Sequence, residues 1–340
     1  MNVLLDAQTD QFIYLTGSGP DITVRRRVSA EIPTPIRIAT PARAIAEFLQ
    51  LIPAGDLDLQ IQGQTLRVHG ATFDTSFRVG NADDMLAPQA DQLSLETKAS
   101  LLGFASAVDQ VRIAQSHDEH QPILNGIYLS IQPSSIVLAA TDGHRAAETH
   151  TSATSEGGQV AVIVPVRALL ELRSVLGSSD RTLSVGVSHG HNRIRFQAGA
   201  DFLDSGLIEG TYPDYRKVLP TGPATAVVVD RLALTLALRA CEVFARAGTN
   251  PVSLTATPGR IRLRGQSTEL GENVSNLDAK VSGPEATVSL SGQYLLDGLV
   301  ALTADTVSLE IRGQRTPVIL SPRSRDKFWY AIAPRLALPK

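Results

Sequence analysis

Two short histidine-containing segments are the first places where this chain could do chemistry. SHDEH, residues 116–120, sets two histidines three residues apart among acids, a spacing that could put two metal ligands on one helical face. No further paired cluster accompanies it and a proline follows, which favours a solvated helix end. SHGHN, residues 188–192, lies between two strand-like runs and is typical of a hairpin turn.

Asp142 and His144 form the one acid–base arrangement that invites a catalytic interpretation. The chain has no G-x-S-x-G elbow, no G-x-x-x-x-G-K-[ST] phosphate loop and no dinucleotide fingerprint after a strand. Cys241 lies in a helix-like apolar run and is predicted to be a buried thiol rather than a nucleophile. The sequence therefore predicts no enzyme, no cofactor and no metal; the remaining enzyme hypothesis is a metal-dependent hydrolase.

Composition indicates a soluble globular protein of two or three domains. The chain has 340 residues, 43% hydrophobic, with a net charge of −3 and a single cysteine. One cysteine allows no internal disulfide and fits a reducing cytosol. No run approaches a membrane span, and the first residues lack the features of a signal peptide, so we expect a cytoplasmic location with no membrane contact. The charge disfavours nucleic-acid binding over the whole surface but permits it on one face.

The chain repeats one plan three times: a short strand, a helix, then two strands. The helix starts align at Pro41, Pro165 and Ser291, residue types suited to the beginning of a helix. Apolar residues then recur at helical spacing, as at Leu169, Leu172 and Leu176. The three copies are residues 36–70, 160–199 and 286–322, and this spacing is that of a domain rather than a solenoid unit.

A strand followed by an amphipathic helix precedes the second and third copies, beginning at Leu93 and Ala226, with Asp230 as a candidate N-cap of the latter helix. The first copy lacks this opening strand and helix. Polar, Pro- and Gly-rich stretches place the domain boundaries near residues 90 and 221. We therefore predict three α+β domains, residues 1–90, 91–220 and 221–340, each with a helical face and an antiparallel sheet face.

The predicted helices carry basic residues outside their apolar stripes. They are Arg43, Lys98, Arg112, Arg167, Arg173, Arg231 and Arg239. Acids such as Glu47 and Asp109 lie among them, so an ordinary solvated helix surface is an alternative for each. Taken together they could form a weak electrostatic lining that contacts DNA phosphates without reading bases.

Three stretches resemble the bacterial β sliding clamp, the beta subunit of DNA polymerase III. They are PILNGIYLSIQPSSIVLAATDGHRAAE from Pro122, LIEGTYPDYRKVLP from Leu207, and the chain end FWYAIAPRLALP. The resemblance extends over essentially the whole chain, and the threefold repeat agrees with it. It implies a head-to-tail homodimeric ring around double-stranded DNA, with helices on the inner side and sheets outside. Such a ring acts by tethering rather than by catalysis.

The resemblance also implies a hydrophobic cleft for short peptides of the polymerase III alpha subunit, the clamp loader, and other polymerases and repair proteins. Carried over by position, the cleft comprises Leu124, Thr141, Gly143, His144, Arg145, Pro213, Val218, Tyr294, Val318 and Pro334. Leu, Val and Pro side chains suit leucine or phenylalanine of a peptide. The dimer contact is expected at Phe73 and Phe77 of one subunit and around Thr249 of the other.

Several positions depart from the family pattern. Gln121 and Lys217 stand where arginine is common, Ala146 where leucine is usual, and Ala333 and Arg335 where methionine is common. Ala146 is expected to widen the peptide pocket. Because the first copy lacks an opening helix, the alternative to a closed ring is a clamp paralogue or truncated form that binds peptides without stable ring closure.

Overall fold

The computed structural model describes residues 2–9, 11–85, 93–155, 158–177, 179, 181–190, 192–247, 250–322 and 327–335. It contains two compact units. Unit 1 comprises Met1–Leu102 and Arg167–Leu207, and unit 2 comprises Gly103–Val166 and Ile208–Lys340. Among the described residues, the strand pairings within each unit are antiparallel, which confirms the predicted α+β class.

The main sheet of unit 1 joins strands from both of its chain segments. Its order is β8 (Gly80–Asn81), β4 (Ile36–Pro41), β1 (Asn2–Thr9), β2 (Phe12–Ser18), β3 (Ile22–Ser29), β16 (Asp201–Gly206), β15 (Arg193–Ala198), β14 (Thr182–Ser188) and β9 (Leu93–Ser100). A second sheet holds β5 (Asp58–Gln62), β6 (Thr65–Gly70) and β7 (Phe73–Arg78). The short helices are α1 (Ala42–Leu51), α3 (Val166–Leu170), α4 (Leu172–Leu176) and the 3-10 turn η1 (Ala82–Asp84).

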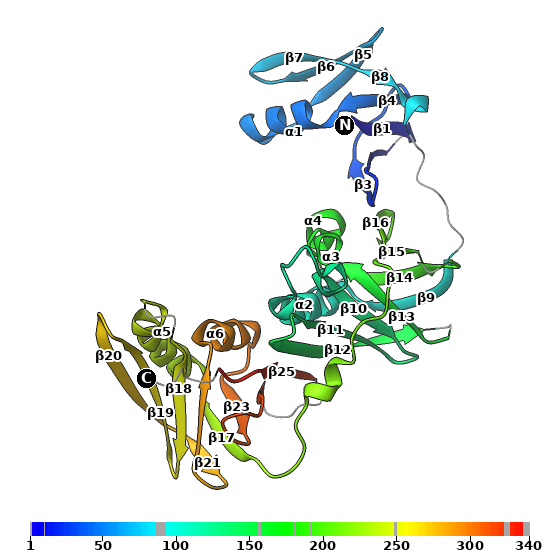
Figure 1. Cartoon of the computed structure of the whole chain (residues 1–340). Helices are drawn as coiled ribbons and strands as arrows, with labels where there is room; N and C mark the ends of the chain where they lie inside the picture. The colour runs from blue at the N-terminus through cyan, green and yellow to red at the C-terminus, as the bar shows by residue number, and fades with distance from the viewer. Residues whose placement is uncertain are drawn as a thin grey trace. The chain divides into compact units, whose positions relative to one another are not determined.

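Unit 2 is built on one long sheet and one shorter sheet (Figure 1). The long sheet has the order β13 (Val160–Pro165), β10 (Gly126–Ile131), β11 (Ser135–Thr141), β12 (Arg145–Ser155), β25 (Phe328–Ile332), β24 (Val318–Ser321), β23 (Thr306–Ile311), β17 (Thr225–Asp230) and β21 (Lys280–Ser282). The shorter sheet has the order β20 (Gly271–Asp278), β19 (Arg260–Ser267), β18 (Val252–Thr257) and β22 (Ala286–Leu290). The helices are α2 (Leu101–Val111), α5 (Arg231–Ala247) and α6 (Gly292–Ala301), with 3-10 turns η2 (Arg112–Ala114), η3 (Pro122–Asn125) and η4 (Tyr215–Val218).

The helix starts follow the local sequence closely. The Ser291 side chain accepts a hydrogen bond from the Tyr294 N–H at the start of α6, and Asp230 accepts one from the Ala233 N–H at the start of α5. Both predicted N-caps are thus confirmed. Pro41 differs slightly, because it is itself the N-cap of α1 rather than a residue of its first turn.

The predicted apolar positions form the cores. Leu169, Leu172 and Leu176 are buried, although the helix predicted for this copy is divided at Glu171 into α3 and α4. In unit 1, Leu5, Ile38 and Leu66 pack with Phe48 of α1. In unit 2, α5 packs on β19 and β20 and contacts α6, as Figure 1 shows. Among the described residues, no helix is both long and apolar enough to cross a membrane.

Lys98 was predicted to lie on a helix together with the other basic residues, but in the structure it lies on a strand. It lies in β9, paired with Ser184 of β14, and its side chain is on the exposed side of the sheet. The helix of this segment begins only at Leu101, because the alternation of exposed and buried residues continues through Ser100. The expectation that Lys98 belongs to a helix was therefore wrong.

Candidate functional site at the junction of β12, β25 and the 208–219 segment

The turn from Thr141 to Arg145 is fixed by its own side chains. The Asp142 carboxylate accepts hydrogen bonds from the N–H groups of His144 and Arg145, each at 2.9 Å. The Thr141 hydroxyl donates to the Arg145 carbonyl at 2.7 Å and accepts from the Gly143 N–H. Gly143 has φ +85°, a conformation that only glycine adopts readily. Asp142 is therefore occupied in shaping the turn, and its role here is structural.

Arg145 is held from three directions. Its Nε donates to Asp142 at 2.8 Å, its Nη1 donates to Asp297 of α6 at 2.5 Å, and its guanidinium carbon lies 4.1 Å from the ring centroid of Tyr294. A planar guanidinium between two carboxylates and an aromatic ring is strongly oriented. The Tyr330 hydroxyl completes this group by donating to the Tyr294 carbonyl at 3.0 Å, and burial raises the pKa of Tyr330.

Strand register divides the predicted cleft residues between two faces of the long sheet. Arg145 pairs with Ile332, and Ile332 pairs with Val318, so these three side chains share a face. That face is the one covered by α6, and Val318 is completely buried in it. Thr141 belongs to the opposite face, because it pairs with Ala146, the neighbour of Arg145.

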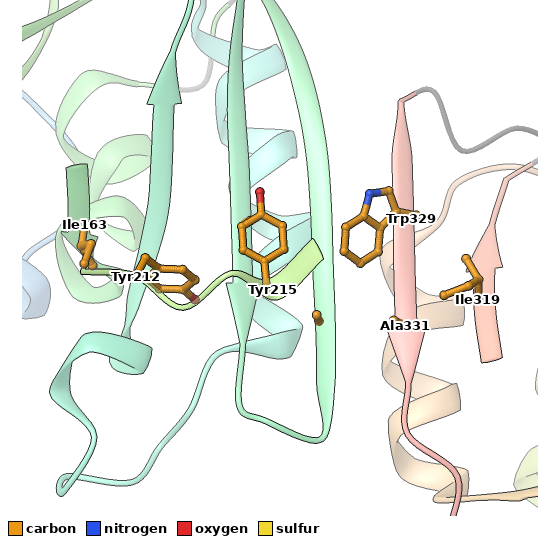
Figure 2. Close-up of a cluster of buried hydrophobic side chains, with 8 residues drawn as sticks. Ile163, Tyr212, Tyr215, Ile319, Trp329 and Ala331 are labelled. Carbon is orange, nitrogen blue, oxygen red and sulfur yellow. The ribbon is translucent and has the colours of Figure 1, made fainter. Parts of the chain in front are cut away.

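The opposite face is covered by the segment of residues 208–219. Tyr212 and Tyr215 of this segment pack on a floor made by Ala139, Ala146, Ile163, Ile319, Trp329 and Ala331. Figure 2 shows the two tyrosines on the crossing segment, with the Trp329 indole directed from β25 toward Tyr215. The rings of Tyr215 and Trp329 are stacked with centroids 6.1 Å apart. We call this assembly the junction cluster.

Tyr212 ties the junction cluster to the turn. Its hydroxyl oxygen accepts a hydrogen bond from the Thr141 N–H at 3.1 Å, and burial raises its pKa to about 12. Its ring lies 5.4 Å from that of Tyr128 in β10. Ala146, where the family pattern has leucine, is buried within the same cluster.

Glu148 is a buried carboxylate that receives hydrogen bonds from three elements. Its Oε2 accepts from the Tyr215 hydroxyl at 2.6 Å and from Arg216 Nε at 2.7 Å. Its Oε1 accepts from the Trp329 indole N–H at 3.2 Å and lies 3.1 Å from His150 Nε2. Burial acts to raise the pKa of Glu148, but the hydrogen bonds from Arg216, Tyr215 and His150 outweigh it and lower the pKa.

The remaining predicted cleft residues lie around the junction cluster at different depths. Leu124 is half-buried and packs on the cluster, whereas Pro213 and His144 are exposed and Val218 is 40% exposed. Pro334 is half-buried in the chain end, where the Ala333 N–H donates to the His144 carbonyl and the Arg335 N–H donates to the Ser289 carbonyl. The structure thus brings the chain end beside the turn that carries His144.

Sequence reasoning missed the residues that hold this site together. Glu148, Trp329 and Tyr128 were not singled out, and Tyr215 appeared only within the stretch LIEGTYPDYRKVLP. The signal for Glu148 was a carboxylate directly after Ala146 and Ala147, at a buried position of the strand, where a charge must be paired.

The basic residues predicted to face DNA lie in different surroundings. Arg43 is 90% exposed and pairs with Glu47, and Arg112 lies in η2 paired with Asp109. Arg231 is half-buried, with its Nε donating to the Ala304 carbonyl. The others, Arg167, Arg173 and Arg239, are exposed on α3, α4 and α5.

Phe73 and Phe77, predicted at the dimer contact, are half-buried and make edge contacts with Phe48, at 5.2 and 5.6 Å between centroids. Thr249 lies outside the described residues. The dimer contact therefore stays a prediction.

The segments that suggested chemistry have structural roles where they are described. Residues 115–120 form a loop and turn rather than a helix end, and residues 188–190 lead into the predicted hairpin turn. Cys241 is fully buried, as predicted, and burial raises the pKa of its thiol. Within the described parts of the chain, no cluster of three or more His, Cys, Asp or Glu side chains is arranged to hold a metal.

Comparisons with known proteins agree on one family. Residues 100–214 match the model of the DNA polymerase III beta subunit central domain, and residues 216–335 match the model of its C-terminal domain. The beta sliding clamp of Synechococcus elongatus is 28% identical over 346 residues, which cover 98% of this chain and 90% of that protein. The beta sliding clamp of Staphylococcus aureus is 27% identical with the same coverage.

Solved structures give the same result for the fold. A DNA polymerase sliding clamp from Pseudomonas aeruginosa superposes with a TM-score of 0.88 at 25% identity, covering 98% of this chain and 92% of that one. The Bacillus subtilis clamp superposes with a TM-score of 0.89 at 22% identity, covering 99% and 91%. The resemblance seen in the sequence is confirmed, and the chain belongs to the family of bacterial DNA polymerase III beta subunits, the beta sliding clamps.

Proposed function

We propose that this chain is a DNA sliding clamp, which pairs with a second copy to form a ring around duplex DNA. It acts in the bacterial cytoplasm by tethering and makes or breaks no bond itself. A polymerase held on the ring stays at high effective concentration near its template after each dissociation, which raises processivity. Family membership over most of the chain supports this proposal.

The exposed basic residues of the helices are consistent with sequence-independent contact to DNA. Arg167, Arg173 and Arg239 are exposed on three separate helices, α3, α4 and α5. Contacts of this kind neutralise phosphates without reading bases, so binding should weaken as salt rises. A loose contact also suits a ring that has to move along its DNA.

The junction cluster is the observation that supports a binding site for partner peptides. In this cluster the 208–219 segment packs on an apolar floor that includes residues of β12 and β25, and Val218 and Pro213 of that segment are exposed. We propose that short peptides of the polymerase III alpha subunit, the clamp loader and other polymerases or repair proteins bind there through leucine or phenylalanine side chains. Ala146 and Ala331 are small and are buried within the cluster.

Light scattering at micromolar concentration tests ring formation. We expect a mass of twice the 36.3 kDa chain. We further expect the protein to be retained on nicked circular DNA and lost when that DNA is linearised. A monomer that still binds peptides would support the second candidate, a clamp paralogue or truncated form without stable ring closure.

Fluorescence anisotropy with a short peptide containing adjacent leucine and phenylalanine tests the partner site. Val218→Glu should weaken binding at least tenfold, because it introduces a charge next to Leu219, which packs against the junction cluster. The matched control is Val243→Glu, since Val243 is an exposed valine on α5, away from the junction cluster. Equal binding by all three proteins would exclude the junction cluster as the peptide site.

A further inference from the structure

One face of the unit 1 sheet combines arginines with aromatic rings. Directly paired residues form a row across six strands of this face: Lys98, Ser184, Gln197, Phe202, Arg25 and Thr16. Because side chains alternate along each strand, Phe12, Tyr14, Arg27 and Arg195 lie on this face too. We call Phe12, Tyr14, Arg25, Arg27, Arg195 and Phe202 the arginine–aromatic face.

Its three guanidinium groups each lie over an aromatic ring. The distances from guanidinium carbon to ring centroid are 4.1 Å for Arg25 and Tyr14, 4.3 Å for Arg27 and Phe12, and 4.6 Å for Arg195 and Phe202. Stacking of this kind restrains the arginine side chains. The face therefore presents oriented cations beside flat apolar surfaces.

The positive charge of this face is only partly balanced. Arg195 is paired with Asp204, with its Nε 2.6 Å from the carboxylate. Within the described residues, Arg25, Arg27 and Lys98 form no ion pair, and the buried Nε of Arg25 has no hydrogen-bond acceptor. Two further acids lie nearby: Glu96, two residues from Lys98 on β9, accepts from the Ser184 hydroxyl, and Asp201 accepts from the Arg27 backbone N–H and is paired with Arg181. The exposed Arg27 and the half-buried Arg25 are thus not neutralised by a carboxylate of the described residues.

The spacing between Arg25 and Arg27 on β3 suits a nucleic-acid strand, which carries both phosphates and bases. Arg25 and Arg27 are two residues apart on one strand, which separates them by roughly 6.8 Å along the sheet. A guanidinium stacked on a ring still offers its N–H edges to phosphate and its outer plane to a base. An acidic peptide would use the charges alone, whereas aromatic rings interleaved with cations are the combination that binds single-stranded nucleic acid.

We propose that the arginine–aromatic face binds single-stranded nucleic acid without sequence preference. The site shares no residue with the helices expected to face duplex DNA or with the junction cluster, and the proposal does not depend on the ring or the peptide site. Phosphates pair with Arg25, Arg27 and Lys98, and bases stack on the guanidinium–aromatic layers.

Fluorescence anisotropy with a labelled 12-nucleotide oligo(dT) and the full chain tests this proposal at several salt concentrations. The variant R25Q/R27Q should bind at least fivefold more weakly at low salt. The slope of log K against log salt should fall by about 1.4, since each single-strand phosphate contact contributes about 0.7. R25K/R27K keeps the charges but loses the planar stacking, and should fall between the wild type and R25Q/R27Q.

The matched control is R260Q/R262Q. Arg260 and Arg262 are also exposed and two residues apart on a strand, β19 of unit 2, with no aromatic partner among the described residues. The affinity of R260Q/R262Q for oligo(dT) should stay within twofold of the wild-type affinity. Circular dichroism should show that all variants are folded. Absence of wild-type binding, an equal loss in both glutamine variants, or no loss in R25Q/R27Q would overturn the proposal. So would equally tight binding of a poly-glutamate peptide, which would indicate an acidic protein partner instead.

Discussion

The phenol of Tyr215 donates a 2.6 Å hydrogen bond to the Glu148 carboxylate across 67 positions of sequence. This contact fixes the 208–219 segment to β12, and Glu148 extends it to β25 through Trp329. Burial and the neighbouring carboxylate raise the pKa of Tyr215, so the phenol remains a donor at every physiological pH. The proposed peptide site therefore depends on one buried acid.

Replacing that acid should destabilise the protein. Glu148→Gln keeps the shape and one acceptor oxygen but removes the charge that Arg216 and Tyr215 require, and we expect a cost of about 2–3 kcal/mol. The thermal midpoint and the urea midpoint of unfolding measure it. The control is Glu47→Gln, which breaks only an exposed pair with Arg43 and should change stability by less than about 0.5 kcal/mol. A Glu148 variant as stable as this control would contradict the role assigned to the buried carboxylate.

The same carboxylate predicts a pH dependence. Because the folded-state pKa of Glu148 is lowered from its ordinary value of 4.5, its contribution is fully present above that value and is lost as pH falls through the folded-state pKa. The difference in unfolding midpoint between the wild type and Glu148→Gln should stay constant from about pH 8 to pH 5.5 and shrink toward about pH 3. A difference that already declines near neutral pH would mean that the folded-state pKa is raised, contrary to the hydrogen bonding observed.

Arg145 should not tolerate lysine. Lysine keeps the positive charge near Asp297 but cannot donate in the same fixed geometry to Asp142 or stack a plane on Tyr294. We expect a cost of about 1–2 kcal/mol and weaker binding of the leucine–phenylalanine peptide. Arg43→Lys, at a highly exposed helix position, should leave both quantities unchanged. If Arg145→Lys behaved like that control, charge alone would explain the role of Arg145.

Gly143 should be needed for its backbone conformation rather than for space. A Cβ there would meet no atom within 4 Å, but φ is +85°, so Gly143→Ala should cost about 1 kcal/mol. Gly55 supplies the matched control, because its Cβ position is equally open and its φ is not positive. Chemical denaturation of Gly143→Ala and Gly55→Ala separates the two effects, and equal midpoints would show that the turn adapts without strain.

The amino-acid pattern determined the local structure and the family. Alternating apolar residues predicted the strands, and Ser291 and Asp230 predicted two helix starts. These features depend on side chains close in sequence, which is why they could be predicted. The boundary between β9 and α2 was misplaced because Lys98 suits an exposed position in either element.

Tertiary structure decided which predicted site residues share a face. The pairing of Arg145 with Ile332, and of Ile332 with Val318, puts these residues under α6, while Thr141 and Ala146 meet the tyrosines of the 208–219 segment. A shift of one residue in this register would exchange the two faces, and no local pattern encodes it. Glu148 meets Trp329 across 181 positions for the same reason: only the pairing of β12 with β25 brings the carboxylate and the indole together.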